Sequence, residues 1–403
     1  MRRKNRTPFK HIRLADPTLW TTNLLFLAGA VFLNSFGSGV LNGVRTNFFV
    51  DTLGLTGGQV LWLEGIREIP GLILMFIAAL TMLLPLSYRA AAALFIMGVG
   101  YALYATVGSY VALLLMAVFA SLGMHLWFPL YKALGMSLSQ KARTGEVMGS
   151  LNGVTALAGI AGMGTISLLT RLFAELPLGA YYVLGGALIG LGALLLIRIP
   201  PQVGATANEQ PRMLLDRRYW LYYVLTFFQG SRKQVLNTFG MLVLVENFGL
   251  EVWQISLLLL VSGVVNFVGS PALGRLLDRL GERSVMAASY VLLALCCIGF
   301  ATLDQVWFLA ALLLVIKLLV TLGIGLDTYV YRIAPEEELT PTLSAGISIN
   351  HVTSVAMPLI AGALLPLIGY SGIFWGTAGL ILLSVPFALA MKAAAAPQAI
   401  ATT

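Results

Sequence analysis

The chain has 403 residues, of which 58% are apolar and only 10% are Asp, Glu, Lys or Arg. Ordinary soluble domains carry charge on about a quarter of their residues, and no water-soluble core could bury so much apolar surface. A soluble enzyme is therefore excluded, and an all-α polytopic membrane protein is predicted. A β-barrel is also excluded, because apolar runs such as residues 257–265 lack the alternating polarity of barrel strands.

The net charge of +8 is distributed unevenly along the chain. Most Lys and Arg residues fall in the N-terminal tail, in alternate loops or at the C-terminal end, whereas Arg171 is expected on the opposite side. By the positive-inside rule both termini are expected in the cytoplasm, which requires an even number of spans. Membrane topology thus explains the positive charge, and no nucleic-acid partner is expected. We expect a multi-pass protein of the plasma membrane, which is the inner membrane in a bacterium.

The first 21 residues form a basic segment before an apolar stretch that is too long for a signal peptide. We therefore expect residues 1–21 to be a retained cytoplasmic tail. Its cations are Arg2, Arg3, Lys4, Arg6, Lys10 and Arg13.

Twelve apolar stretches long enough to cross a bilayer follow in order. The first six predict an N-terminal six-helix bundle over residues 22–197, with spans near 22–50, 59–83, 89–108, 110–135, 146–170 and 179–197. Residues 198–218 are polar and contain Pro200, Pro201 and Pro211, so a cytoplasmic central linker is expected there. The last six predict a C-terminal six-helix bundle over residues 219–391, with spans near 219–245, 253–273, 285–303, 306–332, 342–367 and 372–391. Residues 392–403 are expected to form a second cytoplasmic tail.

Two short matches between the halves indicate an internal repeat. The stretch 50–55, followed by Gln59, matches the stretch 245–250, followed by Gln254, where the first span of each half ends. Residues 152–155 and 350–353 match in the fifth span of each half. Both matches keep the same order and direction, so we expect two pseudo-symmetric bundles related by a parallel repeat.

The stretch 274–283 follows the eighth span and reads Gly-Arg-Leu-Leu-Asp-Arg-Leu-Gly-Glu-Arg. This pattern resembles the signature of the major facilitator superfamily, in which glycines flank an Asp-Arg pair and a further cation follows. The resemblance implies two six-helix bundles that rock about a central substrate site. It also implies that five residues lock the cytoplasmic face: Gly274, Asp278, Arg279, Gly281 and Arg283. An ordinary cationic loop that only enforces topology is the alternative.

The equivalent stretch of the first half, residues 79–88, has Leu83 where the signature carries its carboxylate. We therefore expect the cytoplasmic lock to depend on the second half. The fifth span carries Gly159, Gly162 and Gly164 without the proline of the family's proton-antiporter motif, which disfavours exchange of drugs for protons.

Ionisable residues within spans are expensive to bury and are functional candidates by default. Glu64, Arg67 and Glu68 are spaced i, i+3 and i+4 in span 2, which predicts one shared helical face. Arg45 lies near the outer end of span 1. The four side chains could be a neutralised cluster that only joins spans 1 and 2. Alternatively, Arg45 and Arg67 bind an anion while Glu64 or Glu68 carries a proton.

Arg232 and Lys233 lie near the middle of span 7, where two adjacent cations are hard to explain by packing alone. The family resemblance implies that spans 1, 4, 7 and 10 surround the cavity, so we expect both to bind substrate together with Lys317 of span 10. The alternative is an internal salt bridge to Glu68 or Asp327. Arginine has a planar fork that suits carboxylate or phosphate.

Three further titratable groups lie within spans. Asp327 could carry a proton or pair locally with Arg332. His351 is a candidate proton site, although a satisfied buried histidine is equally compatible. His125 is more weakly favoured for function. The expected proton-coupling residues are Glu64, Glu68, Asp327 and His351.

The charges within spans leave an excess of two positive charges, because Arg45, Arg67, Arg232, Lys233 and Lys317 face Glu64, Glu68 and Asp327. The favoured function is therefore proton-coupled transport of a small organic anion by alternating access. The runner-up is efflux of amphiphilic or toxic compounds. In that case aromatic side chains would line the site: Phe227, Phe228, Trp127 and Tyr329.

Other classes lack their motifs. No phosphate-binding loop of an ATP-driven pump occurs, and no catalytic or metal-ligand motif supports a membrane-embedded enzyme, which remains a distant alternative. Cys296 and Cys297 are adjacent in an apolar stretch and are expected to be core residues. We expect no cofactor and no metal. The expected partners are a small molecule, a proton and the lipid bilayer, and the protein is expected to be a monomer.

Overall fold

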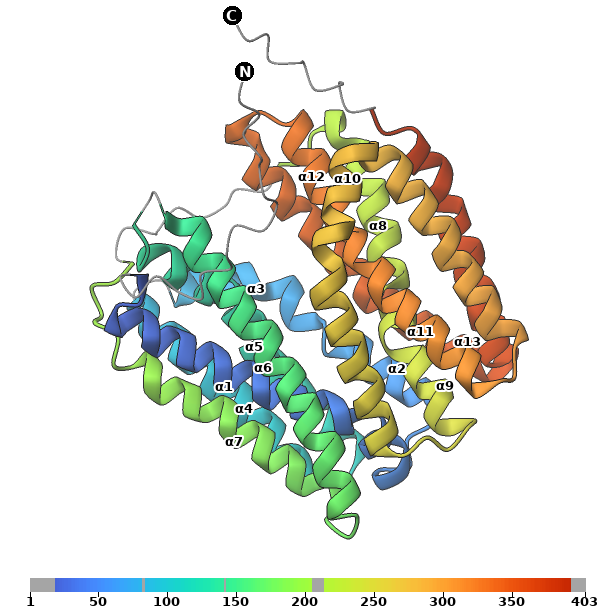
Figure 1. Cartoon of the computed structure of the whole chain (residues 1–403), viewed down its shortest axis with the longest axis horizontal. Helices are drawn as coiled ribbons and strands as arrows, with labels where there is room; N and C mark the ends of the chain where they lie inside the picture. The colour runs from blue at the N-terminus through green and yellow to red at the C-terminus, as the bar shows by residue number, and fades with distance from the viewer. Residues whose placement is uncertain (1–18, 82–83, 141–142, 205–213, 393–403) are drawn as a thin grey trace, which may run out of the picture.

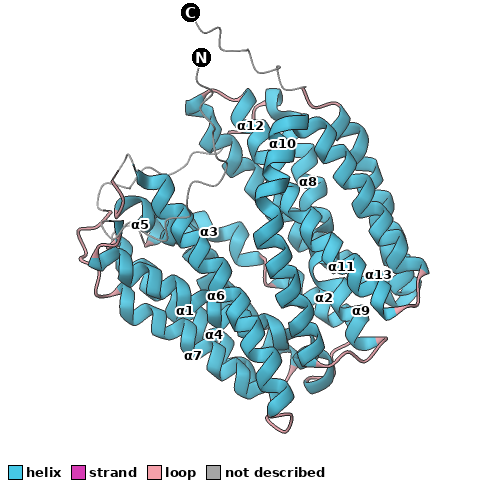
Figure 2. Ribbon diagram, viewed as in Figure 1, coloured by secondary structure: helices cyan, strands magenta, loops and turns pink. Residues whose placement is uncertain are grey.

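The computed structural model describes residues 19–81, 84–140, 143–204 and 214–392, and these ranges contain helices and loops but no strand (Figure 2). The two tails and the middle of the central linker lie largely outside them. In the first half the helices are α1 (Thr22–Asn47), α2 (Gly57–Ile66), α3 (Ile69–Leu80), α4 (Leu86–Ala102), α5 (Tyr110–Ser137), α6 (Thr144–Leu172) and α7 (Leu178–Leu196). A π-helical turn (Phe48–Thr52) extends α1, and a 3-10 turn (Leu103–Thr106) extends α4.

The second half repeats this plan with longer continuous helices. It contains α8 (Trp220–Gln234), α9 (Gly240–Glu246), α10 (Val252–Thr302), α11 (Val306–Val320), α12 (Ile324–Ile333) and α13 (Glu336–Leu389). The π-helical turn Val235–Phe239 joins α8 to α9, and the 3-10 turn Thr321–Gly323 joins α11 to α12. Helix α10 breaks at Gly281 and α13 at Gly369, where φ is 74° and 65°.

The helices agree with the predicted order of spans. Eight helical runs are long and apolar enough to cross a membrane, and two of these, α10 and α13, each contain two spans. The remaining two spans are the interrupted ones, α2 with α3 and α8 with α9, because breaks and charges shorten their apolar runs. The all-helical membrane fold predicted from the sequence is confirmed.

The internal repeat is visible in the backbone. Gly54 and Gly249 both have φ of 64°, a left-handed conformation that glycine adopts without strain. Each is followed by a helix start with the same capping box, formed by Thr56 with Gln59 and by Glu251 with Gln254. The first span of each half therefore leaves the membrane and reverses direction in the same way.

The second span differs from the expectation of one continuous helix. Helix α2 ends at Ile66 and α3 begins at Ile69, with Pro70 in the first turn of α3. Proline has no N–H to donate, and its ring clashes with the carbonyl four residues earlier, here that of Ile66, so the helix breaks. The predicted single helical face holds for Glu64 and Arg67, which form an i,i+3 ion pair, but it is wrong for Glu68, whose carboxylate meets the second half.

The two halves meet at the end opposite the central linker. Figure 1 shows α2 reaching from the first half to lie among helices of the second, near α9 and α13. There the Nε1 of Trp62 donates to the carbonyl of Leu359 at 3.1 Å, and the Nδ2 of Asn47 donates to the carbonyl of Leu250 at 2.8 Å. A Cβ built on Gly58 would lie only 3.0 Å from the carbonyl oxygen of Gly362. Glycine thus permits close approach of the two backbones.

The linker end is open by comparison. Among the described residues, a Cβ built on Gly145, Gly149 or Gly153 of α6 would have no neighbouring atom within 4 Å, and the same holds for Gly274 of α10. Farther along α6, by contrast, the Oγ of Ser167 donates to the carbonyl of Trp253 in α10 at 2.9 Å. The pair α6 and α10 is therefore in contact away from the linker and separated beside it.

Candidate functional site

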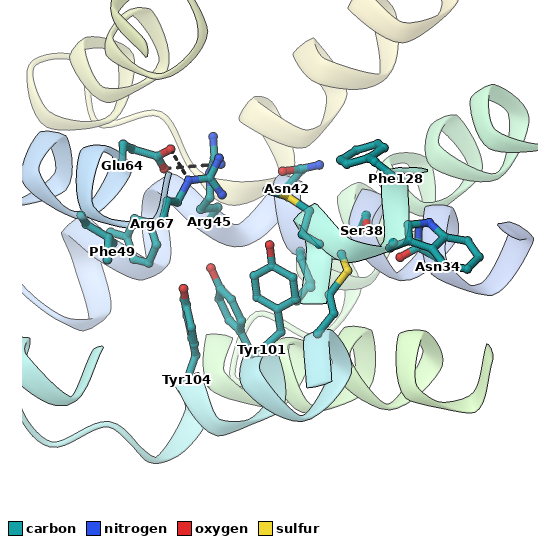
Figure 3. A pocket seen from close by; sticks show the side chains of 16 residues that line it. Asn34, Ser38, Asn42, Arg45, Phe49, Glu64, Arg67, Tyr101, Tyr104 and Phe128 are labelled. Carbon is teal, nitrogen blue, oxygen red and sulfur yellow. Dashed lines mark ion pairs between the residues drawn. The ribbon is translucent and has the colours of Figure 1, made fainter. Parts of the chain in front are cut away.

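The first half encloses a cavity of about 210 Å³ between α1, α2, α4, α5 and α7. At one end Glu64 forms ion pairs with two arginines (Figure 3), to Arg45 Nη1 at 3.4 Å and to Arg67 Nε at 2.8 Å. Only 1% of the Glu64 side chain is exposed, whereas each arginine is 19% exposed toward the cavity. One carboxylate therefore balances two guanidinium groups, which leaves this end of the N-half cavity with a net positive charge.

Tyrosines form the wall beside these charges. The rings of Tyr104 and Tyr182 are stacked with centroids 5.1 Å apart, and Tyr101 packs edge-on against Tyr104 at 5.7 Å. In Figure 3 the hydroxyls of Tyr101 and Tyr104 point toward the Arg45–Glu64–Arg67 group. The wall thus offers both apolar ring faces and hydroxyl groups to a bound solute.

A polar stripe on α1 completes the N-half cavity. Asn34, Ser38 and Asn42 are spaced four residues apart, so they lie on one face of the helix, and all three line the cavity. The Oδ1 of Asn34 is buried without a hydrogen-bond partner in the described chain, which makes it available to a solute donor. The sequence predictions missed this stripe, although its spacing is readable in span 1.

Glu68 is the centre of a second cluster that joins the two halves. Its carboxylate lies 3.0 Å from Lys233 Nζ and 3.2 Å from His351 Nδ1, both from the second half. The Nε2 of Gln234 donates to the other oxygen at 3.2 Å. From the first half, His125 Nε2 lies 3.8 Å away. With only 2% of Glu68 exposed, this buried carboxylate connects the bundles.

The two histidines are packed tightly beside this carboxylate. Their ring centroids are 5.1 Å apart, and a Cβ on Gly71 would collide with both rings. The Nδ1 of His125 lies 2.8 Å from the carbonyl of Ser121, which requires a hydrogen on Nδ1. Neutral His125 would then present a lone pair to the Glu68 carboxylate, so a proton on either group relieves the repulsion.

Glu68, His125 and His351 have ligand atoms within 4.8 Å of one another and could in principle hold a metal ion. However, Lys233 occupies the same carboxylate, and Arg67 lies 3.9 Å from it. A divalent cation would have to displace or neutralise these charges. The electrostatics of the cluster therefore disfavour a metal ion.

The second half encloses a cavity of about 250 Å³, whose polar lining comes from Gln229, Arg232, Lys233, Asn237, Tyr290 and Asn350. Arg232 is only 5% exposed. Its guanidinium lies 4.0 Å from the centroid of the Tyr290 ring, and its Nη1 donates to Ser384 Oγ at 3.4 Å. The C-half cavity thus contains a buried cation that the described chain supplies with no carboxylate partner.

A model of the Major Facilitator Superfamily matches residues 27–326 and 222–401 of the chain. The chain belongs to this superfamily. It is similar in structure to the nucleoside transporter NupG, with 16% identity, a TM-score of 0.75 and an alignment covering 92% of this chain and 99% of that one. No curated protein sequence matches significantly.

Two other transporters have the same fold. One is a bacterial homologue of the human lysosomal transporter Spinster, solved inward-facing and occupied, with 14% identity, a TM-score of 0.70 and coverage of 91% and 95%. The other is the human organic anion transporter MFSD10, with 16% identity, a TM-score of 0.60 and coverage of 91% and 99%. At such identities the likeness shows the fold alone, and membership of the superfamily makes the chain a secondary transporter.

The remaining predicted site residues of this facilitator lie elsewhere. Lys317 donates to the carbonyl of Asn237 at 2.9 Å and to its Oδ1 at 3.3 Å, and it lines neither of the two cavities. Asp327 is exposed and has no ion-pair partner in the described chain. Its alternative local partner, Arg332, pairs instead with Glu282. That local-pair alternative is therefore wrong.

The signature residues occupy the open end of the facilitator. Asp278, Arg279 and Arg283 are exposed, and the described chain offers them no ion pair. Gly281 forms the break between the two spans of α10, with φ of 74° and ψ of 156°. Leu83, the counterpart position in the first half, lies outside the described residues.

Proposed function

We propose that this facilitator is a proton-coupled transporter of a small organic anion that works by rocker-switch alternating access. The observation that carries the proposal is the Glu68 cluster. One buried carboxylate binds Lys233 and His351 of the other half and faces His125 of its own, at distances of 3.0, 3.2 and 3.8 Å. A proton and a substrate anion can therefore act on the same group of side chains.

Protonation of Glu68 would link the two events. The charged groups that face it are Arg67, Lys233, His125 and His351, and Gln234 adds a neutral donor. Neutral Glu68 attracts these cations less, so Lys233 becomes free to bind a substrate anion. Conversely, a bound anion compensates the cations that Glu68 releases. Proton and anion thus favour each other's binding, which is the thermodynamic requirement for symport.

An anionic substrate is supported by the charge balance. Glu64 is shared by Arg45 and Arg67, Glu68 is held by Lys233, and Arg232 and Lys317 have no carboxylate partner in the described chain. Uncompensated cations at this depth are costly unless an anion joins them. We include Arg45, Arg67, Arg232, Lys233 and Lys317 in the proposed substrate path. Glu64 and Asp327 remain secondary candidates for the coupling proton.

The conformational part of the proposal rests on the predicted topology. If both termini are cytoplasmic, the linker end faces the cytoplasm, and the contacts on the opposite side make this an inward-facing state. The exposure of Asp278, Arg279 and Arg283 is then expected, because their lock forms only when the cytoplasmic side closes. Gly274 and Gly281 would permit the close approach of helices in that state.

Efflux of amphiphilic compounds has less support. Of the four aromatic side chains expected to line such a site, Trp127 borders the N-half cavity, but the other three line neither cavity. Phe228 packs against Phe387 with ring centroids 5.6 Å apart, and Phe227 packs against Phe228. These rings stabilise helix packing and do not line the two cavities.

The test is transport by the purified protein in proteoliposomes. Labelled benzoate, lactate and succinate are each offered with and without a pH gradient, and labelled tetraphenylphosphonium represents the amphiphilic cations. We expect the pH gradient to accelerate movement of at least one anion by about tenfold or more in the unaltered protein. Glu68→Gln should remove this acceleration, whereas Glu175→Gln, an exposed loop carboxylate, should retain it. Movement of tetraphenylphosphonium without any anion would contradict the proposal.

A further inference from the structure

Arg232 differs from the other cations within the spans. Arg45 and Arg67 share Glu64, and Lys233 is held by Glu68. Lys317 has two oxygen acceptors on Asn237, which satisfy two of its three N–H donors. Arg232 is 5% exposed and has a single long hydrogen bond of 3.4 Å for a group with five N–H donors.

Burying a guanidinium with so few acceptors is costly, because the lost hydration must be replaced by hydrogen bonds or by opposite charge. The Tyr290 ring, 4.0 Å from the guanidinium carbon, offers partial compensation through its electron-rich face. The hydroxyl oxygen of Tyr290 can accept from the guanidinium as well, which still leaves most of the five N–H groups without an acceptor in the described chain. The site around Arg232 therefore lacks a negative charge and several hydrogen-bond acceptors.

A second unsatisfied group lies at the same place. The guanidinium lies over the face of Tyr290, and the buried Tyr290 hydroxyl finds no acceptor for its own hydrogen in the described chain. Both side chains line the C-half cavity of about 250 Å³. Two buried donors that face one cavity would both be satisfied by a single oxyanion placed between them.

The charge and shape of the site indicate the class of oxyanion. Only one guanidinium lacks a counter-ion here, which matches a single negative charge. Its planar fork fits the two oxygens of a carboxylate. The amides of Gln229, Asn237 and Asn350, which line the same cavity, can hydrogen-bond to polar groups next to that carboxylate.

We propose that the C-half cavity is the carboxylate site of this transporter, in which Arg232 and Tyr290 bind the carboxylate of a monocarboxylate substrate. The inference rests on the proposed anion transport and makes it more specific. Arg45 and Arg67 at least share Glu64, whereas Arg232 has no carboxylate partner, so we assign the N-half cavity, with its tyrosines and its α1 stripe, to the polar remainder of the solute. Arg232 is thus the primary determinant of anion binding.

The test measures binding to the whole protein, so it does not depend on transport. Benzoate and inorganic phosphate are titrated against the purified protein, and the half-effective concentration is taken from the rise in its melting temperature. We expect benzoate to stabilise the unaltered protein more effectively than phosphate. Arg232→Gln should weaken benzoate binding at least tenfold and Tyr290→Phe several-fold, because each removes a hydrogen bond to a charged group. Arg198→Gln, an exposed arginine at the end of α7, is the matched control.

Several outcomes would overturn the inference. One is that benzoate does not change the melting temperature of the unaltered protein. Another is that Tyr290→Phe and Arg232→Lys both bind benzoate as the unaltered protein does. A third is that only Arg67→Gln weakens benzoate binding. Stronger binding of phosphate than of benzoate would also overturn it. The two conservative variants keep the test decisive if Arg232→Gln does not fold. Proton-driven anion transport that survives in Arg232→Gln would refute this site while leaving the proposed function in place.

Discussion

The two halves of this transporter repeat one backbone plan but stabilise their buried charges in different ways. In the first half, Arg45 and Arg67 share the carboxylate of Glu64. In the second half, Arg232 packs over the ring of Tyr290, and Lys317 donates to neutral oxygens of Asn237. Lys233 forms an ion pair with Glu68 of the other half. Two of the three second-half cations thus have only neutral partners from their own bundle, and the third depends on a carboxylate of the first half. We therefore expect the buried cations of the second half to respond more strongly to a bound anion and to movement of the first half.

The largest effect should come from the shared carboxylate of the first half. Glu64→Gln removes the counter-ion of two guanidinium groups at once, and breaking a buried ion pair by deleting one partner costs about 3–5 kcal/mol. We expect a loss of this size in the free energy of unfolding, measured by chemical denaturation in detergent. Glu175→Gln, in an exposed loop, is the control and should change it little. A loss below about 1 kcal/mol would show that the first half does not depend on this group.

An intermediate effect should come from the turn between the two spans of α10. Gly281 has φ of 74° and ψ of 156°, a region open almost only to glycine. Gly281→Ala should therefore lower the free energy of unfolding by about 1–3 kcal/mol. Gly274→Ala is the matched control on the same helix, with helical backbone and open space around it, and should be neutral or slightly stabilising. Equal effects of the two variants would contradict this assignment of strain.

The smallest effect should come from Lys317, a cation of the second half whose acceptors are both neutral oxygens of Asn237. Lys317→Met replaces a buried ammonium by an apolar side chain of similar length, and such changes are often neutral or stabilising. We expect a change within about 1 kcal/mol in either direction, measured alongside Glu64→Gln. If Lys317→Met lowered the free energy of unfolding as much as Glu64→Gln does, the buried charges of the two halves would contribute equally to stability.

The order and limits of the spans could be predicted because they depend on local properties. Bilayer thickness fixes the length of an apolar stretch, and the placement of cations fixes its direction. The family resemblance carried by residues 274–283 is local as well. The proline at position 70 predicts a helix break in the same local way. Leaving this break out of the prediction placed Glu68 on the same helical face as Glu64 and Arg67.

The partners of the buried charges could be predicted only as alternatives. Glu68 and Lys233 are 165 positions apart in the chain, and their contact depends on how two bundles pack. The salt bridge between them was one of two possibilities that the sequence allowed. His125 received little weight because a lone histidine in an apolar stretch is ordinarily a core residue. Its role becomes visible only once His351 and Glu68 are beside it.

The close contact around Gly58 and Gly362 has a kinetic consequence. On that side of the molecule no ion pair joins the two halves within the described chain, and the backbones touch through glycines. Apart from Arg171, which lies 5.2 Å over the ring of Trp253, the contacts named on this side are uncharged, so dissolved salt has few interactions to screen. The rate at which this side of the molecule opens should therefore respond to temperature and much less to ionic strength.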